Sequence, residues 1–336
     1  MARGKTSLRV LAGLTAFALA GLTACGTGGG APGASGGSGG GEKKAIGVSV
    51  ADQKSLFYVA AVQGMQAQAE KRGYKLVVTS ANNNSSQQVS QVNDLLTQQV
   101  GALIFTSQDS TAAAAGVKAA NKAEVPVIAV DQRPESGQGQ LATYIATDSV
   151  KAARDLCTWM FQQMGGSGEI AILHGVLGST AEIQRTQGCQ EAIKATPGVK
   201  VVAEETANWD ETEAFKATQN ILAAHPQLKA VFGESDAMGL GAAKAAEQAN
   251  RHDGMWFVGI DGFPTMFDGV KSGLTQATMA QQPYHMGEIA VDNAIQIMEG
   301  GAALPAEQYQ DTVLINKETV DQNDVTKFYG PNAKSS

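Results

Sequence analysis

The sequence predicts an α/β protein made of two doubly wound lobes, each a parallel sheet covered by helices on both faces. From Ile46 onward, short apolar runs alternate with amphipathic stretches, which is the pattern of parallel strands joined by helical crossovers. The 336 residues correspond to about two domains of ordinary size. A composition of 43% hydrophobic and 17% charged residues supplies two cores and excludes both general disorder and a coiled coil.

The first half of the body contains four strands that alternate with helices, and then a fifth strand. The helix over 57–72 illustrates the reasoning, because Ala61, Val62, Met65 and Ala69 fall on one face at helical spacing. The strands are expected at 46–50, 75–79, 102–106, 126–130 and 143–146, and the helices at 57–72, 86–99 and 111–123.

The second half repeats the alternation. The strands are expected at 169–174, 199–205, 230–234, 256–261, 275–280 and 311–315. The helices are expected at 151–164, 181–195, 212–224, 237–250, 265–271 and 284–298. The residues after 315 are mostly polar, and we assign the last of them, 329–336, to a tail.

The first 44 residues predict export and attachment to a membrane. Three early cations precede an apolar run over 10–20 that is too short to span a bilayer, which is the layout of a signal peptide over 1–24. The sequence Leu22-Thr23-Ala24-Cys25 resembles the bacterial lipoprotein box, and this resemblance implies cleavage before Cys25 and lipidation of its thiol. An ordinary signal peptide with an incidental cysteine is the alternative. Residues 25–44 then form the lipidated cysteine and a glycine-rich tether.

Charge and cysteine content exclude several kinds of partner. Loss of residues 1–24 changes the formal net charge from −7 to −10, so a nucleic acid is not expected as a partner. The cysteines and histidines do not fall at metal-ligand spacings, and we predict no metal and no cofactor. Cys157 and Cys189 lie on two successive predicted helices. They form either a disulfide or two separate buried thiols.

Polar and aromatic residues follow the strands at the edge where parallel sheets bind ligands. Carboxylates accept protons from hydroxyl groups, guanidinium and amide groups donate to them, and aromatic rings cover apolar C–H faces. This mixture suits a neutral ligand with many hydroxyl groups. The candidate site residues are Ser55, Phe57, Tyr58, Asp131, Gln132, Arg185, Trp209, Ser235, Asp261 and Gln281.

Stretches along the whole body carry a family resemblance. They are Phe57-Tyr58, Asn82-Asn83-Asn84, Pro126 to Asp131, Ala146-Thr147-Asp148, Arg185-Thr186-Gln187-Gly188, Ala224-His225-Pro226, Ala230-Val231-Phe232, Gly259-Ile260-Asp261-Gly262 and Ala277 to Gln281. In these stretches the chain resembles the periplasmic sugar-binding proteins of the ribose-binding type, which are solute receptors of ABC importers.

The resemblance implies the type I periplasmic binding protein fold, a Venus-flytrap of two lobes joined by a hinge of three crossings. The crossings would lie near 146–148, 281–282 and 309–310. The N-lobe would comprise 45–146 plus 282–309, and the C-lobe 147–281 plus 310–328. A membrane permease and its ATPase would be the partners, and the receptor itself would be a monomer outside the cytoplasm.

The resemblance also implies the role of each candidate residue. Phe57 and Tyr58 match the aromatic pair that stacks on the sugar, and Trp209 the opposing aromatic. Asp131 matches the carboxylate that grips hydroxyl groups, and Arg185 the arginine of the C-lobe. Asp261 and Gln281 match contacts in the C-lobe and at the hinge.

Departures from the ribose pattern bear on the ligand. Ser55 and Ser235 stand where ribose binders have asparagine. Gln132 replaces an arginine, and Arg133 comes one residue late, so its reach to the ligand is left open. These changes shorten or neutralise polar arms and predict another monosaccharide or a sugar alcohol. We expect Ala at Arg185 or at Asp131 to abolish most affinity with little loss of stability.

Parts of the sequence pattern are also found in other classes of function. A receptor for a small signalling ligand, such as an autoinducer or a nucleoside, would share the site chemistry. A serine hydrolase could use Ser235, Asp261 and His285 in the order found in α/β-hydrolases, but Ala237 breaks the nucleophile motif. A transcription regulator of the same fold would need a helix-turn-helix where this chain has a signal peptide and a tether. The sequence therefore predicts a binding protein and no enzyme.

Overall fold

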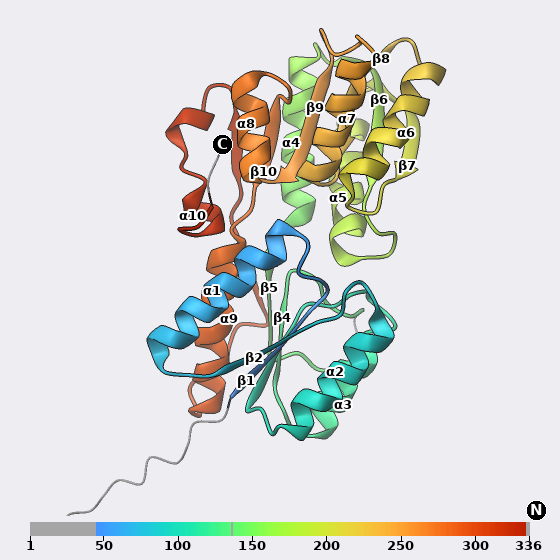
Figure 1. Ribbon diagram of the computed structural model, residues 1–336. Helices are drawn as coiled ribbons and strands as arrows, with labels where there is room; N and C mark the ends of the chain where they lie inside the picture. The colour runs from blue at the N-terminus through green and yellow to red at the C-terminus, as the bar shows by residue number, and fades with distance from the viewer. Residues whose placement is uncertain (1–44, 136, 334–336) are drawn as a thin grey trace, which may run out of the picture. The chain divides into compact units, whose positions relative to one another are not determined.

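The computed structural model describes residues 45–135 and 137–333 (Figure 1). The predicted signal peptide (1–24), the predicted lipidation site Cys25 and the predicted tether lie outside the described residues. No helix of the described part is long and apolar enough to cross a membrane.

The first lobe is built on a six-stranded parallel sheet. Its strands, in spatial order, are β2 (Leu76–Ser80), β1 (Ile46–Val50), β3 (Ala102–Phe105), β4 (Val127–Val130), β5 (Thr143–Thr147) and β11 (Glu307–Gln310). Helices α1 (Leu56–Arg72) and α9 (Pro283–Met298) pack together on one face. Helices α2 (Ser85–Thr97) and α3 (Ala114–Lys122) pack together on the other (Figure 1).

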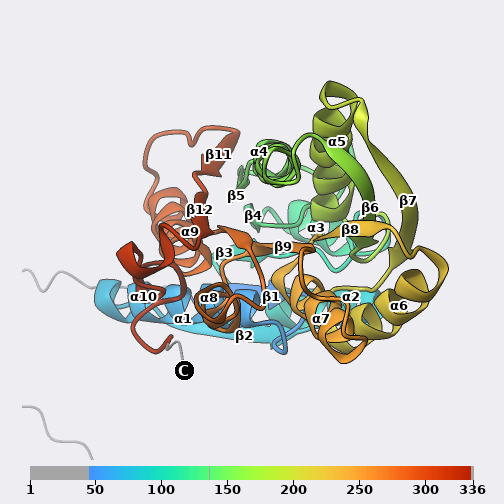
Figure 2. The ribbon, with the colours of Figure 1, turned by 90° about the horizontal axis from the view of Figure 1, so that it is seen from above.

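The second lobe repeats this plan. Its sheet runs β7 (Gly198–Thr206), β6 (Ser167–His174), β8 (Leu228–Gly233), β9 (Trp256–Asp261), β10 (Ala277–Ala280) and β12 (Val313–Asn316). Helices α4 (Ser149–Gln163) and α5 (Thr180–Ala195) pack against each other. The remaining helices, α6 (Glu211–Ala224), α7 (Asp236–Gln248) and α8 (Pro264–Ser272), form a second contiguous layer (Figure 2).

The chain passes between the two sheets at three places: between β5 and α4, between β10 and α9, and between β11 and β12. The predicted fold class, two doubly wound lobes joined by three crossings, is confirmed. The central strands explain why this fold class could be predicted from the sequence. All four residues of β3 and all four of β4 are apolar and buried, as expected for parallel strands covered on both faces.

Small residues let helices of the first lobe approach closely. A Cβ atom on Gly64 of α1 would lie 2.0 Å from the carbonyl oxygen of Tyr284 on α9. One on Gly287 of α9 would lie 2.1 Å from the carbonyl oxygen of Ala61. Because no side chain fits at either position, α1 and α9 pack backbone against backbone. This contact joins the beginning of the first lobe to the segment that returns to it late in the sequence.

A disulfide joins α4 to α5. Cys157 and Cys189 are fully buried, with their Cα atoms 5.5 Å apart, which is an ordinary separation for bonded cysteines. The choice that the sequence left open between a disulfide and two thiols is therefore resolved by the structure in favour of the disulfide.

Three expectations need correction. The last strand, β12, is antiparallel to β10, because it continues from β11 and so enters the second sheet at the edge where the parallel strands end. The strand β11 has the polar sequence Glu-Gln-Tyr-Gln and gave no apolar signal. Tyr329, assigned to the polar tail, is buried at the end of helix α10 (Thr326–Tyr329), because its ring packs against that of Phe263.

Candidate ligand-binding site

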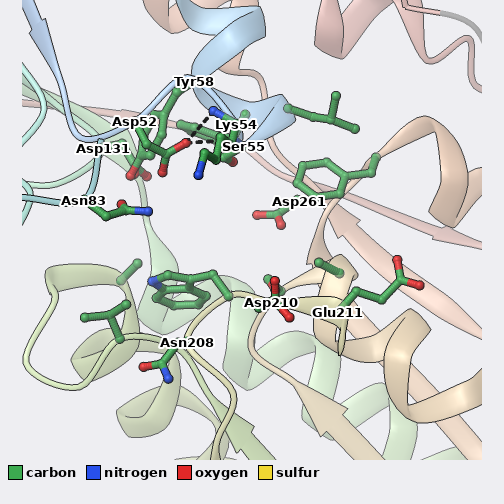
Figure 3. Close-up of a pocket in the computed structure, with 18 of the residues that line it drawn as sticks. Asp52, Lys54, Ser55, Tyr58, Asn83, Asp131, Asn208, Asp210, Glu211 and Asp261 are labelled. Atoms are coloured by element: carbon green, nitrogen blue, oxygen red, sulfur yellow. Dashed lines mark hydrogen bonds between the residues drawn. The ribbon is translucent and has the colours of Figure 1, made fainter. Parts of the chain in front are cut away.

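A cavity of about 810 Å³ lies where the carboxyl ends of both sheets meet. Figure 3 shows Ser55, Tyr58 and Asp131 on one side of it and Asn208, Asp210 and Glu211 on the other. All ten residues that the sequence predicted line this cavity: Ser55, Phe57, Tyr58, Asp131, Gln132, Arg185, Trp209, Ser235, Asp261 and Gln281. The structure therefore brings the predicted set together from both lobes.

The first lobe contributes a hydrogen-bonded chain of polar side chains. The Tyr58 hydroxyl donates to the Asp131 carboxylate at 3.0 Å, and Gln132 Nε2 donates to the Tyr58 oxygen at 3.1 Å. Asp131 follows β4 with a φ of 61°, in the left-handed region that aspartate tolerates better than most residues. Its carbonyl oxygen accepts a hydrogen bond from Tyr144. The turn after β4 thus points the carboxylate into the cavity and holds it there.

The start of α1 supplies the aromatic wall. The Asp52 carboxylate accepts hydrogen bonds from the backbone N–H groups of Lys54 and Ser55, at 2.7 and 2.8 Å. This turn ends β1 and leads into α1. The rings of Phe57 and Tyr58 then meet edge to face, with centroids 5.4 Å apart, and both side chains are buried. They form a rigid apolar surface beside the polar chain.

The second lobe contributes a buried cation. Arg185 on α5 is only 3% exposed. Its Nη1 lies 3.6 Å from Oδ1 of Asp261 and donates to the carbonyl oxygen of Glu234. The guanidinium carbon lies 5.6 Å from the centroid of the Trp209 ring, within the range of a cation–π contact. The arginine is therefore held by a carboxylate, a carbonyl and an aromatic ring.

Trp209 owes its position to local backbone geometry. Asn208 and Trp209 both have positive φ angles, of 50° and 65°. The indole ring packs on Gly175, where an added Cβ atom would lie 2.0 Å from a ring atom. Only glycine fits at that position, so the loop after β6 and the loop after β7 fix the ring together.

Asp261 and Gln281 link the site to the crossings between the lobes. Gln281 Nε2 donates to Asp261 Oδ1 at 2.8 Å, and its Oε1 accepts from the Thr147 hydroxyl at 2.7 Å. Thr147 ends β5, and Gln281 directly follows β10. Side chains at two of the three crossings are therefore hydrogen-bonded to each other and to a carboxylate of the cavity.

Burial dominates the electrostatics of the site. Burial raises the pKa of Asp261 to about 8, and the positive charge of Arg185 opposes that rise. Burial likewise raises the pKa of Asp236, to about 6. Asp236 supports the wall from behind, because its carboxylate accepts from the N–H groups of Gly262 and Phe263, both at 2.7 Å. Burial also raises the pKa of Asp131 despite Arg185. One cation thus serves three carboxylates.

Three buried polar atoms of the wall are left without a hydrogen-bond partner among the described residues. They are Nε of Arg185, a donor, and Oε1 of Gln108 and of Gln132, both acceptors. Buried polar groups are nearly always paired in folded proteins. An unpaired donor and an unpaired acceptor in one cavity indicate a ligand that accepts and donates, as a hydroxyl group does.

Other residues of the cavity wall were missed by the prediction. They include Asp52, Lys54, Asn83, Gln108, Asn208 and Phe263. Asp52 sits in the turn that directly follows β1, so the strand-end rule could have found it. Phe263 offered no such signal, because an apolar residue at a helix start is usually part of a core.

Two residues that the sequence singled out lie away from the cavity. Arg133 does not line it; its Nη1 pairs with Glu307 at 2.6 Å, and its guanidinium lies 4.4 Å from the Tyr144 ring centroid. His285 is half exposed and pairs with Glu288 on its own helix. Ser235 lines the cavity but caps α7 through the N–H of Met238. The described residues therefore do not assemble the hydrolase triad.

His174, Glu182 and Glu234 form the group with metal-ligand spacing found among the described residues. Their polar atoms already form hydrogen bonds with one another and with the backbone. Nδ1 of His174 lies 3.3 Å from Glu234, and the two carboxylates accept from the N–H groups of Gly175 and Gly178. The hydrogen bond to Glu234 raises the pKa of His174. We read the group as a hydrogen-bonded support for the loop after β6.

Comparison with known proteins decides the family. The model of the periplasmic binding protein domain matches residues 46–302. The chain belongs to the periplasmic binding protein family. The ribose import binding protein of Bacillus subtilis is 34% identical over 255 residues, covering 76% of this chain and 82% of that protein. The xylitol-binding protein of Mycolicibacterium smegmatis is 37% identical over 254 residues, covering 75% and 70% respectively.

Solved structures of periplasmic binding proteins share the fold. An ABC transporter solute-binding protein of Actinobacillus succinogenes with bound D-allose has a TM-score of 0.79 and 28% identity, covering 84% of this chain and all of that one. One from Mycobacterium smegmatis with bound glycerol has a TM-score of 0.80 and 26% identity, covering 88% and 100%. Members of this family are substrate-binding proteins and not enzymes.

Proposed function

We propose that this periplasmic binding protein is the extracytoplasmic receptor of an ABC importer and binds a monosaccharide or a sugar alcohol between its lobes. The observation that carries the proposal is the convergence of opposed groups from both lobes on one cavity. Asp131 and Tyr58 face it from the first lobe, and Arg185, Asp261 and Trp209 from the second. Each lobe contributes aromatic rings as well as polar groups: Phe57 and Tyr58 come from the first lobe, and Trp209 and Phe263 from the second.

The unpaired polar atoms support a hydroxyl-rich ligand. A sugar hydroxyl can accept from Nε of Arg185 and donate to Oε1 of Gln132 or to the carboxylates. The rings of Phe57 and Trp209 offer apolar faces for the C–H groups of the same ligand. Charged hydrogen bonds of this kind contribute about 1.5–3 kcal/mol each, and a few of them account for micromolar or tighter binding.

The mechanism proposed is a shift in population. A ligand that contacts both lobes binds the closed arrangement better than an open one and therefore favours it. Contacts beside the cavity support this, because the Ser110 hydroxyl donates to the Gly178 carbonyl at 2.8 Å and the Thr180 hydroxyl to the Arg133 carbonyl at 3.1 Å. Each bond joins one lobe to the other. A permease and its ATPase, the proposed partners, would recognise the closed form.

Five-carbon sugars and sugar alcohols are the first ligands to test. The relative named for xylitol is 37% identical to this chain and the ribose relatives 33–34%. Ser55 and Ser235 both line the cavity, and each offers a shorter arm than the asparagine of the ribose pattern. A site that pairs particular hydroxyl groups rejects analogues that leave its groups unpaired.

A thermal-shift screen of the compact unit Glu42–Ser336 tests the proposal. Pentoses, hexoses, deoxy sugars, pentitols and inositols would be compared at equal concentration. A ligand that binds only the folded state stabilises it by about 2.7 kcal/mol when its concentration is 100 times its Kd, and so raises the melting temperature. One strong hit among the polyhydroxylated compounds is expected. No response to any compound of this panel, followed by a response to nucleosides, amino acids or autoinducers in a second panel, would refute the carbohydrate proposal.

We further propose that Cys25 carries a lipid that holds the monomeric receptor at the outer face of the cell membrane. The lipoprotein box and the glycine-rich segment after it support this. In cells, Cys25→Ala should release the protein from the membrane fraction, whereas the wild type stays with it. Equal release of both proteins into the medium would contradict the anchor and leave the ligand proposal untouched.

A further inference from the structure

The segment after β12 reaches the binding site from behind. It contains a 3-10 turn (Val320–Gln322) and α10. Val320, Val325 and Phe328 are buried in one apolar cluster with residues of α1, α8 and α9. In Figure 2, α10 lies beside α8, α9 and α1, and it contacts α9 and α1 directly. A segment that the sequence analysis divided between the C-lobe (up to residue 328) and a polar tail (from residue 329) is therefore packed against both lobes.

Tyr329, at the end of α10, touches two residues of the cavity wall. Its hydroxyl donates to the carbonyl oxygen of Asp261 at 2.9 Å. Its ring meets that of Phe263 edge to face, with centroids 5.7 Å apart. The side chain is only 3% exposed, so both contacts are shielded from water. Asp261 and Phe263 both line the cavity, while Tyr329 does not.

Asp261 needs such a support. Its φ angle is 156°, a value at which a residue with a side chain is strained. Its carbonyl oxygen accepts from two donors, the Tyr329 hydroxyl and the backbone N–H of Gln281 at 2.9 Å. The orientation of the peptide group after Asp261 follows from both bonds. The two bonds thus hold the backbone at Asp261, from which its carboxylate projects.

The other side of the segment is fixed by the first lobe. Gly330, directly after α10, has a φ of 83°, and an added Cβ atom would lie 2.2 Å from the Tyr284 ring. Tyr284 belongs to α9. A small cavity of about 110 Å³ beside Tyr329 is lined by Leu56 from α1 and Pro264 from α8. Tyr329 thus sits where elements of both lobes meet.

We propose that Tyr329 is a positioning residue of the binding site, which holds the Asp261 carboxylate and the Phe263 ring in the orientation that receives the ligand. The inference rests on the proposed function for its effect on affinity, but the positioning itself can be measured without a ligand. Burial raises the pKa of Tyr329 well above its ordinary value, so its hydroxyl stays a donor over the usual pH range.

Hydrogen exchange in the ligand-free protein tests the positioning. Tyr329→Phe removes the hydroxyl and keeps the ring. The amides of Gly262, Phe263 and Gln281 should then exchange about fivefold faster, which corresponds to the loss of one buried neutral hydrogen bond. Tyr74→Phe is the matched control, because it removes a hydroxyl that donates to Glu299 at the surface. Unchanged exchange at the three amides in Tyr329→Phe would overturn the proposal.

Calorimetry with the ligand found by the screen tests the effect on binding. Tyr329→Phe should weaken binding about three- to tenfold, and Tyr74→Phe should leave it unchanged. In an Asp261→Ala background, Tyr329→Phe should have no further effect, because the carboxylate that it positions is gone. The same loss in both backgrounds would overturn the role through Asp261. If the wild type binds no polyhydroxylated compound, the proposed function fails while hydrogen exchange still decides on Tyr329.

Discussion

Replacing Arg185 should affect ligand affinity and the stability of the free protein for two different reasons. The side chain is buried, and its Nη1 lies 3.6 Å from the Asp261 carboxylate. At an effective dielectric constant of about 20, two charges at that distance attract by about 4–5 kcal/mol. Where Asp261 is ionised, above its pKa of about 8, removing one partner of the buried pair costs about 3–5 kcal/mol, because the other charge remains buried. From the structure we therefore predict a larger loss of stability than we expected from the sequence.

The cost should depend on pH. Burial raises the pKa of Asp261 to about 8. A carboxyl whose pKa is higher in the folded state stabilises the fold below its unfolded pKa and loses that contribution as the pH rises through the folded pKa. Without Arg185 the pKa of Asp261 rises further. At a pH above the pKa of Asp261 in both the wild type and the variant, each unit of that further rise adds about 1.4 kcal/mol to the loss of stability. Arg185→Met should thus destabilise the protein more at pH 9 than at pH 5.

Urea unfolding at pH 5 and pH 9 measures this difference, and Arg185→Lys separates it from binding. Lysine keeps the positive charge, so its free energy of unfolding should stay near that of the wild type at both pH values. It lacks the Nε donor, which is unpaired in the structure, so ligand affinity should still fall at least about tenfold. Equal destabilisation of Arg185→Met at both pH values would refute the charge argument. Full affinity in Arg185→Lys would refute the assignment of Nε to the ligand.

Two further predictions follow from the site and its support. Burial raises the pKa of Asp261 to about 8, and ligand hydroxyl groups that donate to its carboxylate favour the ionised form. Ligand affinity measured by calorimetry should therefore rise from pH 6 to pH 8. An equal rise in Asp261→Asn would show that another group is responsible for the pH dependence. A Cys157→Ala, Cys189→Ala double variant lacks the disulfide, which closes a loop with a sequence separation of 32 residues. Its free energy of unfolding should be lower by about 3–4 kcal/mol. An unchanged midpoint of urea unfolding would show that the disulfide does not stabilise the fold.

The parts of the fold that could be predicted are those in which the local sequence itself indicates whether the residues are buried. The runs Ala102–Phe105 and Val127–Val130 are apolar throughout, and a strand buried on both faces needs that composition. The site residues were readable for a related reason. Parallel strands end at one edge of a sheet, so the polar residues after Val50 and after Val130, two strands of the first sheet, could be expected to meet. That the two lobes face each other was implied only by the family resemblance.

The missed parts depend on partners that are distant in the sequence. Glu307–Gln310 forms an edge strand because it lies beside β5, more than 150 residues earlier in the sequence. Tyr329 is held by Asp261, 68 residues away. A tyrosine in a polar stretch has no local property that distinguishes a buried support from an exposed side chain. Such residues become visible only when tertiary contacts are known.

The charge balance of the cavity limits the ligand further. The positive charge of Arg185 lowers the pKa of Asp131, Asp236 and Asp261, but burial raises the pKa of all three carboxyls more strongly. A ligand with its own carboxylate would add a fourth negative charge to a buried site that already favours protonation. Ligand hydroxyl groups add donors without charge. A sugar alcohol should therefore raise the melting temperature at pH 8, and the corresponding sugar acid should not. A larger shift with the acid would show that Arg185 binds an anion.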